Sequence, residues 1–149
     1  MKKIFRLILI IWAVGFVCFV VWHHLAYGPR TRAKVPQLEA ASALVAAPPE
    51  DQLVHRHVTS KSGQVLVDRT YQSQRDYAAV RAYYDTALTT HGWTFDGEKP
   101  VHDWGRDLGG KTARYRRGED CASLQWAGER ANYGWTYSLS FTWSWTGCR

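Results

Sequence analysis

The last stretch of the chain restricts the fold most, because its side chains alternate strictly between two kinds. Over residues 134–146, every second side chain from Trp135 onward is large and apolar, and the side chains that follow each of them are Ser or Thr. A helix would scatter the apolar side chains around its circumference, whereas a β-strand places them all on one face. We therefore expect a long strand with one buried and one solvent-facing side. The apolar side carries Trp135, Tyr137, Leu139, Phe141, Trp143 and Trp145.

A helix is expected to cover the apolar side of that strand. Ser73, with Asp76 three positions later, predicts a capping box, and Gly92 predicts the C-terminal stop. The segment between them, residues 74–91, has an apolar stripe at helical spacing, which should lie on the sheet. The stripe consists of Tyr77, Val80, Tyr84 and Leu88.

Further strands are expected at residues 63–73, 93–98, 111–117 and 121–127, and a short strand at 54–59 would precede them. The sequence thus predicts an α+β fold. An N-terminal transmembrane helix would be followed by one helix packed on a mostly antiparallel sheet of about four to five strands, in the order β-α-β-β-β-β.

The chain begins with a basic tail and a long apolar run from Ile4 to Trp22. A helix needs about 20 residues to cross a bilayer, and the run supplies them if Arg6 reaches the headgroups. A cleaved signal peptide is the alternative, but its apolar stretch is shorter, and the residues after Trp22 form a poor cleavage site. We therefore expect an uncleaved single-pass anchor in a bacterial inner membrane, with the C-terminal domain extracytoplasmic.

The net charge of +6 belongs to the flanks of this run. Residues 1–34 contain six basic side chains and no acidic one, and the other 13 basic residues balance the 13 acidic ones. This distribution argues against nucleic acid as a partner. We expect three parts: the anchor with a short cytoplasmic tail (1–27), an Ala/Pro-rich linker (28–52) and a small α+β domain (53–149).

Residues 105–112, GRDLGGKT, match the formula of a phosphate-binding loop. That loop needs a buried strand before it and a helix after it, whose N-terminus faces the phosphate. Here Pro100 and two charged side chains precede the match, and the run from Ala113 to Gly118 leaves no room for a helix. We expect a connection between strands and no nucleotide binding.

Cys121 and Cys148 are a candidate disulfide of the expected domain. In a simple hairpin of residues 121–126 and 135–145, Cys148 would overshoot Cys121 by ~20 Å, whereas a bridge needs Cα atoms within about 7 Å. The tail after Gly147 would have to fold back, or the hairpin register would have to shift. The sequence leaves the pairing open.

No pattern identifies a catalytic residue, a cofactor or a metal site. His55 and His57 would lie on the same side of a strand, but no further ligand stands at a recognisable spacing. Four carboxylates crowd one loop region, where acidic residues are ordinary. These carboxylates are Asp96, Glu98, Asp103 and Asp107.

A partner surface is the remaining candidate site. Tryptophans beside predicted turns often mark contact surfaces, and the only basic cluster outside the N-terminal region lies near one of them. The candidate residues are Trp104, Trp135, Arg114 and Arg116.

The run YYDTALTTHGW, in which Tyr84 and Leu88 are followed by Gly92-Trp93, resembles the helix-to-strand junction of small single-pass-anchored bacterial envelope proteins of unknown function. The resemblance implies no catalytic residue.

These patterns predict a membrane-anchored extracytoplasmic module of the bacterial cell envelope that binds or scaffolds a partner, which we expect to be a protein. Two alternatives belong to other classes. One is a small envelope enzyme that acts on cell-wall or lipid material through residues 96–107. The other is a glycan-binding module built on Trp104 and Trp135.

Overall fold

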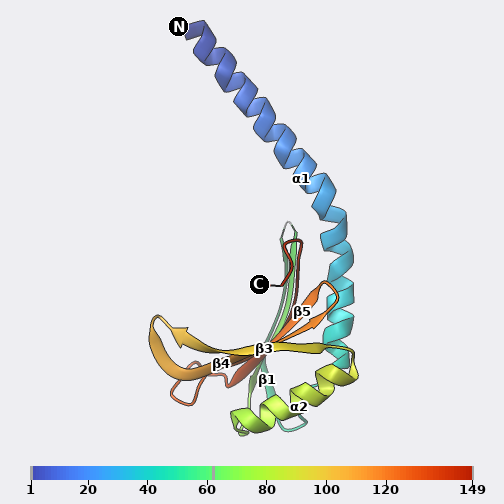
Figure 1. Ribbon diagram of the computed structural model, residues 1–149, viewed down its shortest axis with the longest axis vertical. Coiled ribbons are helices and arrows are strands. Elements are labelled where there is room, and N and C mark those ends of the chain that lie inside the picture. The colour runs from blue at the N-terminus through green and yellow to red at the C-terminus, as the bar shows by residue number, and fades with distance from the viewer. Residues whose placement is uncertain (1, 62, 149) are drawn as a thin grey trace.

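The computed structural model describes residues 2–61 and 63–148, except for the side chains of residues 2–8, 23, 24 and 27 (Figure 1). A long helix comes first, and a β-hairpin, a second helix and four further strands follow it. The elements are α1 (Lys2–Leu44), β1 (Gln52–Lys61), β2 (Gln64–Gln72), α2 (Tyr77–Thr90), β3 (Thr94–Asp103), β4 (Arg106–Arg117), β5 (Asp120–Trp126) and β6 (Tyr137–Ser144).

The strands form one six-stranded sheet in the order β1-β2-β6-β5-β4-β3, and each neighbouring pair is antiparallel. The prediction of about four to five strands in the order β-α-β-β-β-β was therefore wrong, because two full strands precede α2. Strand β1 pairs with β2 along nearly its whole length. Strand β3 lies at the other edge and continues through Pro100, since an edge strand can spare the N–H that proline lacks.

The expected transmembrane helix is also corrected by the structure. Among the residues that the structure describes, no helix is both long enough and apolar enough to cross a membrane. The predicted single-pass anchor in an inner membrane is thus not supported.

Residues 28–44 belong to α1, where the sequence had indicated a linker over 28–52. Figure 1 shows this part of the helix running beside the β1–β2 hairpin, while its N-terminal part extends away from the sheet. Leu38, Ala41 and Val45 lie three to four positions apart, and all are buried in the core. Pro29 and Pro36 lie inside the helix, although proline disfavours a helix interior, so the packing of this face must offset their cost.

The apolar face of β6 forms the centre of the core, as predicted. Tyr137, Leu139, Phe141 and Trp143 are all buried on the side of the sheet that both helices cover. Trp145 departs from the pattern, because β6 ends at Ser144 and the indole of Trp145 is 51% exposed. The predicted strand was too long at both ends.

Helix α2 lies across the sheet with the predicted stripe inward, since Val80, Tyr84 and Leu88 are buried. Its N-cap is Asp76, whose carboxylate accepts a hydrogen bond from the Ala79 N–H at 2.8 Å. Ser73 does not cap the helix as predicted. Its hydroxyl donates to Asp51 and accepts from the Arg75 N–H.

A chain of buried hydroxyl groups joins α2 to β6. The hydroxyl oxygens of Tyr84 and Tyr137 lie 3.1 Å apart, and Tyr137 donates to the Asp51 carboxylate at 2.7 Å. Burial raises the pKa of both tyrosines well above the usual value. Both hydroxyls therefore stay protonated and act as hydrogen-bonding groups within the core.

The packing of α1 on the sheet predicts different effects for two leucines of the same helix. Leu38 is fully buried, whereas Leu44 is 58% exposed. We expect Leu38→Ala to lower the free energy of unfolding by about 2 to 5 kcal/mol. Leu44→Ala, the matched control, should change it by less than about 0.5 kcal/mol. Urea denaturation followed by circular dichroism measures both, and an equally small effect at the two positions would mean that α1 does not pack on the sheet.

Candidate functional site

The side of the sheet away from the helices carries polar side chains, and we call this side the open face. In the middle of the open face, each of five neighbouring strands contributes one polar residue. Directly paired residues of neighbouring strands point to the same side of a sheet. The row across the open face consists of His57, Asp68, Ser140, Ser123 and Arg114.

At one end of this row, the carboxylate of Asp68 is satisfied within the protein. It accepts hydrogen bonds from the hydroxyl of Ser140, on the neighbouring strand β6, and from the hydroxyl of Thr70 at 3.2 Å. These bonds use hydroxyl groups that also face the solvent side of the sheet. The acidic end of the row is therefore already engaged.

Arg114, at the other end of the row, is half-buried and lacks such a partner. Its Nε atom is buried, and no hydrogen-bond acceptor for it is present among the described residues. The Nε of Arg69 is likewise buried without an acceptor among the described residues, but Arg69 lies on the helix-covered side, where its guanidinium donates to the Val45 carbonyl at 2.7 Å. Arg117 donates to the His91 carbonyl at 3.3 Å. A buried donor without an acceptor costs free energy, so Arg114 is the group of the open face that a ligand could satisfy.

Arg114 also lines a cavity with a volume of about 490 Å³. This volume lies in the usual range for small-ligand sites, roughly 300 to 1,000 Å³. The cavity lies between the open face and the C-terminal segment. Its hydroxyl groups come from Thr59, Ser123, Thr142, Ser144 and Thr146.

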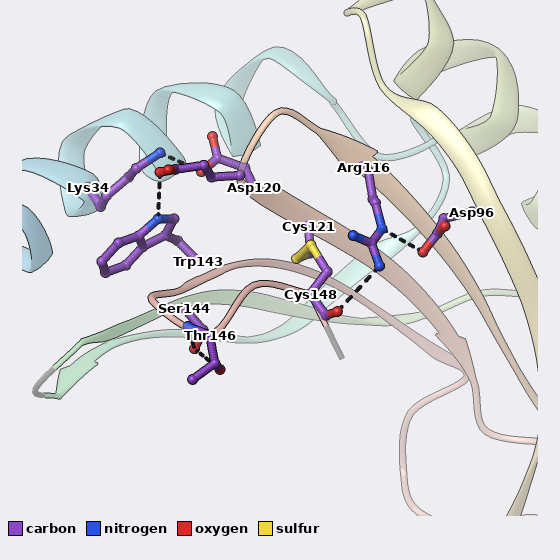
Figure 2. The surroundings of a disulfide bond; sticks show 10 residues. Lys34, Asp96, Arg116, Asp120, Cys121, Trp143, Ser144, Thr146 and Cys148 are labelled. Carbon is purple, nitrogen blue, oxygen red and sulfur yellow. Dashed lines mark hydrogen bonds and ion pairs between the residues drawn. A yellow bond between two sulfur atoms is a disulfide. The ribbon is translucent and has the colours of Figure 1, made fainter.

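A disulfide between Cys121 and Cys148 closes one wall of this cavity, with Cα atoms 5.8 Å apart (Figure 2). The chain turns back directly after β6, where the Gly147 N–H donates to the Ser144 carbonyl at 2.9 Å. Gly147 has a φ of 79°, which favours glycine. The expected hairpin strand ran on to residue 145, where Cys148 would lie beyond Cys121. Because β6 ends at Ser144 and the chain turns back there, Cys148 reaches Cys121.

Arg116, two positions along β4 from Arg114, is engaged within the protein. Figure 2 shows its guanidinium between Asp96 and the C-terminal segment. It donates to the Asp96 carboxylate at 2.8 Å and to the Cys148 carbonyl at 3.3 Å. The hydrogen bond from Arg116 is the main reason that the pKa of Asp96 is below its usual value. Of the two predicted arginines, Arg116 therefore has partners within the protein, whereas the buried Nε of Arg114 has none among the described residues.

The two predicted tryptophans lie away from this cavity. Trp104 is in the β3–β4 turn and is 95% exposed, and Trp135 is in the segment between β5 and β6. Trp135 stacks on Tyr133, with ring centroids 5.5 Å apart, beside a second cavity of about 230 Å³. Of the four predicted surface residues, the two arginines therefore lie together on β4, Trp135 lies beside Tyr133 at the second cavity, and Trp104 lies in a turn outside that cavity.

The four carboxylates of residues 96–107 do not form a facing pair. Each contacts a different arginine: Asp96 contacts Arg116, Glu98 contacts Arg81, Asp103 contacts Arg106 and Asp107 contacts Arg130. The pKa of Asp103 is lowered chiefly by a hydrogen bond from Tyr133, and that of Asp107 by the Gly109 backbone N–H.

The two histidines and the segment GRDLGGKT, which the sequence also singled out, lie within strands or the turn between them. His55 and His57 lie on β1 with ring centroids 6.1 Å apart, and the described residues contain no group of three or more metal-ligating side chains. GRDLGGKT, expected as a loop between strands, spans the β3–β4 turn and the first half of β4. The segment that follows it continues as strand.

Comparison of the chain with models of protein families, with curated proteins and with solved structures gave no match.

Sequence reasoning missed Asp68, Ser140 and Ser123 as members of the site. Each belongs to an alternating strand, so its side of the sheet was predictable, but the sequence does not show which residues of separate strands are paired. Only the strand order brings this row to Arg114.

The three cysteines provide an internal control for the disulfide. Cys121 and Cys148 are bonded, whereas Cys18 is free. We expect Cys121→Ser to lower the free energy of unfolding by about 2 to 4 kcal/mol under non-reducing conditions, and Cys18→Ser to leave it unchanged. Denaturation curves measure this difference. Thiol titration of the unfolded, unreduced protein should find one reactive thiol in the parent protein and none in Cys18→Ser; three thiols in the parent would contradict the bond.

Proposed function

We propose that the protein is a binding module whose open face holds a ligand through an oxyanion, such as a carboxylate or a phosphate. The observation that carries this proposal is the unpaired, buried Nε of Arg114 at the cavity of about 490 Å³. Guanidinium groups match the planar geometry of carboxylates and phosphates with parallel N–H donors. An oxyanion in the cavity would supply the missing acceptor.

The surroundings of Arg114 favour an anion over other ligand groups. The carboxylate of Asp96, which also lines the cavity, accepts a hydrogen bond from Arg116, so it is not free to pair with Arg114. The other polar groups of the cavity are mainly hydroxyls, which can donate to an anion or accept from a neighbouring part of the ligand. Lys61 lines the same cavity, so Arg114 is not its only cationic side chain, and the neutral donors around them are suited to bind the oxygens of an anion.

The arrangement supports binding rather than catalysis. A general acid or base works best with a pKa near the working pH. The pKa values of Asp96, Asp103 and Asp107 are all below their usual value, so these groups stay ionised at neutral pH. They lie on an edge hairpin in separate ion pairs, where they hold arginines in place.

The proposal predicts that Arg114 senses small oxyanions directly. Titration of the full chain with acetate or inorganic phosphate, at constant ionic strength set with chloride, should shift the Arg114 Nε–H resonance in NMR spectra along a saturable curve. Isothermal titration calorimetry measures the affinity of variants that lack this reporter, and Arg114→Gln should weaken binding by roughly tenfold or more, because a charge-assisted hydrogen bond is lost.

Arg130→Gln is the matched control, since Arg130 is exposed and already pairs with Asp107. It should leave the affinity unchanged. A Kd that is the same in Arg114→Gln and the parent protein, or shifts that never saturate, would disprove the anion site.

A further inference from the structure

The second cavity, at the other end of the open face, has an aromatic wall. It has a volume of about 230 Å³ and lies between the β3–β4 hairpin and the segment that joins β5 to β6. Tyr133 and Trp135 line it with nearly parallel rings, whose planes differ by 23°. Tyr133 is 41% exposed, so part of this stacked pair is open to a ligand.

The backbone on both sides of this pair is fixed to the sheet. Directly after Trp135, the Thr136 N–H donates to the Tyr71 carbonyl at 2.8 Å, and the Thr136 carbonyl accepts from the Ala127 N–H at 2.9 Å. On the other side, the Arg130 N–H donates to the Leu108 carbonyl of β4 at 3.2 Å, and the Ala131 N–H donates to the Gly128 carbonyl at 3.1 Å. The aromatic pair is therefore held in place before any ligand binds, which reduces the entropy cost of binding.

The polar groups around the pair indicate which ligand fits. Asp103, His102 and Gln125 line the same cavity, and no lysine or arginine is among its described lining residues. The Asp103 carboxylate is paired with Arg106, which does not line the cavity, so the described cavity wall offers no cation to a phosphate-bearing ligand such as a nucleotide. A neutral ligand rich in hydroxyl groups can instead donate to Asp103 and Gln125.

We propose that this second cavity is a carbohydrate subsite, in which a neutral sugar ring lies against Tyr133 and Trp135 and hydrogen-bonds to Asp103 and Gln125. The C–H groups on one face of a sugar ring are weakly positive, and they match the negative face of an aromatic ring. The hydroxyl groups at the edge of the sugar ring reach the polar side chains. The inference rests on the proposed role as a binding module, but it uses none of the residues of the Arg114 cavity.

The open face connects the two cavities. Gln125 lines the carbohydrate subsite, and Ser123, two positions earlier on β5, lines the Arg114 cavity. These two residues lie on the same side of the strand, about 7 Å apart at the usual rise. An oligosaccharide with one acidic unit could therefore place a neutral ring on Trp135 and its carboxylate at Arg114.

The test uses neutral chito- and cello-oligosaccharides added to the full chain, with the indole N–H of Trp135 as the reporter in the parent protein and isothermal titration calorimetry as the measure of affinity in the parent and every variant. We expect a saturable shift of this resonance with at least one of the two sugars. Trp135→Ala should weaken the affinity by roughly tenfold, a factor typical for the loss of one stacked ring. Trp135→Phe keeps an aromatic face and should retain most of the affinity, which separates lost stacking from a disturbed loop.

Two control variants make the result specific. Trp104→Ala removes a more exposed tryptophan that does not line the cavity, and it should leave the affinity within about twofold of the parent. Arg114→Gln should bind the neutral sugars as the parent does while losing acetate and phosphate, so the two proposals can fail separately.

Three outcomes would overturn the carbohydrate subsite. The first is no shift of the Trp135 indole with either sugar. The second is an affinity for the sugars that Trp104→Ala lowers and Trp135→Ala leaves unchanged. The third is a stronger response to an arginine-rich peptide or to adenosine monophosphate than to the sugars, which would assign the aromatic pair to a protein or a nucleotide.

Discussion

Strand β6 is the constraint on which the rest of the structure depends. It lies inside the sheet, between β2 and β5, and its alternating side chains divide the protein into two environments. Tyr137, Leu139 and Phe141 require an apolar cover, which the two helices provide. The Ser and Thr side chains between them need no apolar cover, because their hydroxyl groups can hydrogen-bond to water. One helix layer is thus sufficient, and the described helices leave the opposite face of the sheet uncovered.

The cover depends on a contact between α1 and the β4–β5 turn. Lys34 pairs with Asp120 at 2.7 Å, and both side chains are largely buried next to the indole of Trp143, as Figure 2 shows. The indole N–H of Trp143 donates to Glu119 of the same turn, and Arg30 pairs with Glu119 from α1. A partly buried pair of this kind fixes the position of two elements more than it adds to stability. It therefore sets where α1 lies on the sheet, and the buried side of α1 includes Leu38.

The elements with short-range patterns were predictable from the sequence, and those that depend on distant partners were not. The buried face of α2 and that of β6 follow from periods of 3.6 and 2 residues, which any stretch of chain carries in itself. The helical state of residues 28–44 depends on a sheet that forms from later residues, and two prolines in the segment indicated the opposite. The turn after Ser144 was hidden because Trp145 continues the alternating pattern although the strand has ended. For the site, the sequence indicated Arg114, but not that its neighbours leave it without a partner.

The contrast between Arg114 and Arg116 explains why Arg114 has no carboxylate partner. The two arginines lie on the same side of β4, and a single carboxylate, Asp96, influences both. Arg116 takes this carboxylate and also bonds to the carbonyl of Cys148, which the disulfide to Cys121 holds nearby. The disulfide therefore fixes the Cys148 carbonyl, which accepts a hydrogen bond from Arg116. Because Arg116 also binds the Asp96 carboxylate, Asp96 does not pair with Arg114. In this arrangement the disulfide does more than close a loop, because it helps to keep the charge of Arg114 available to the cavity.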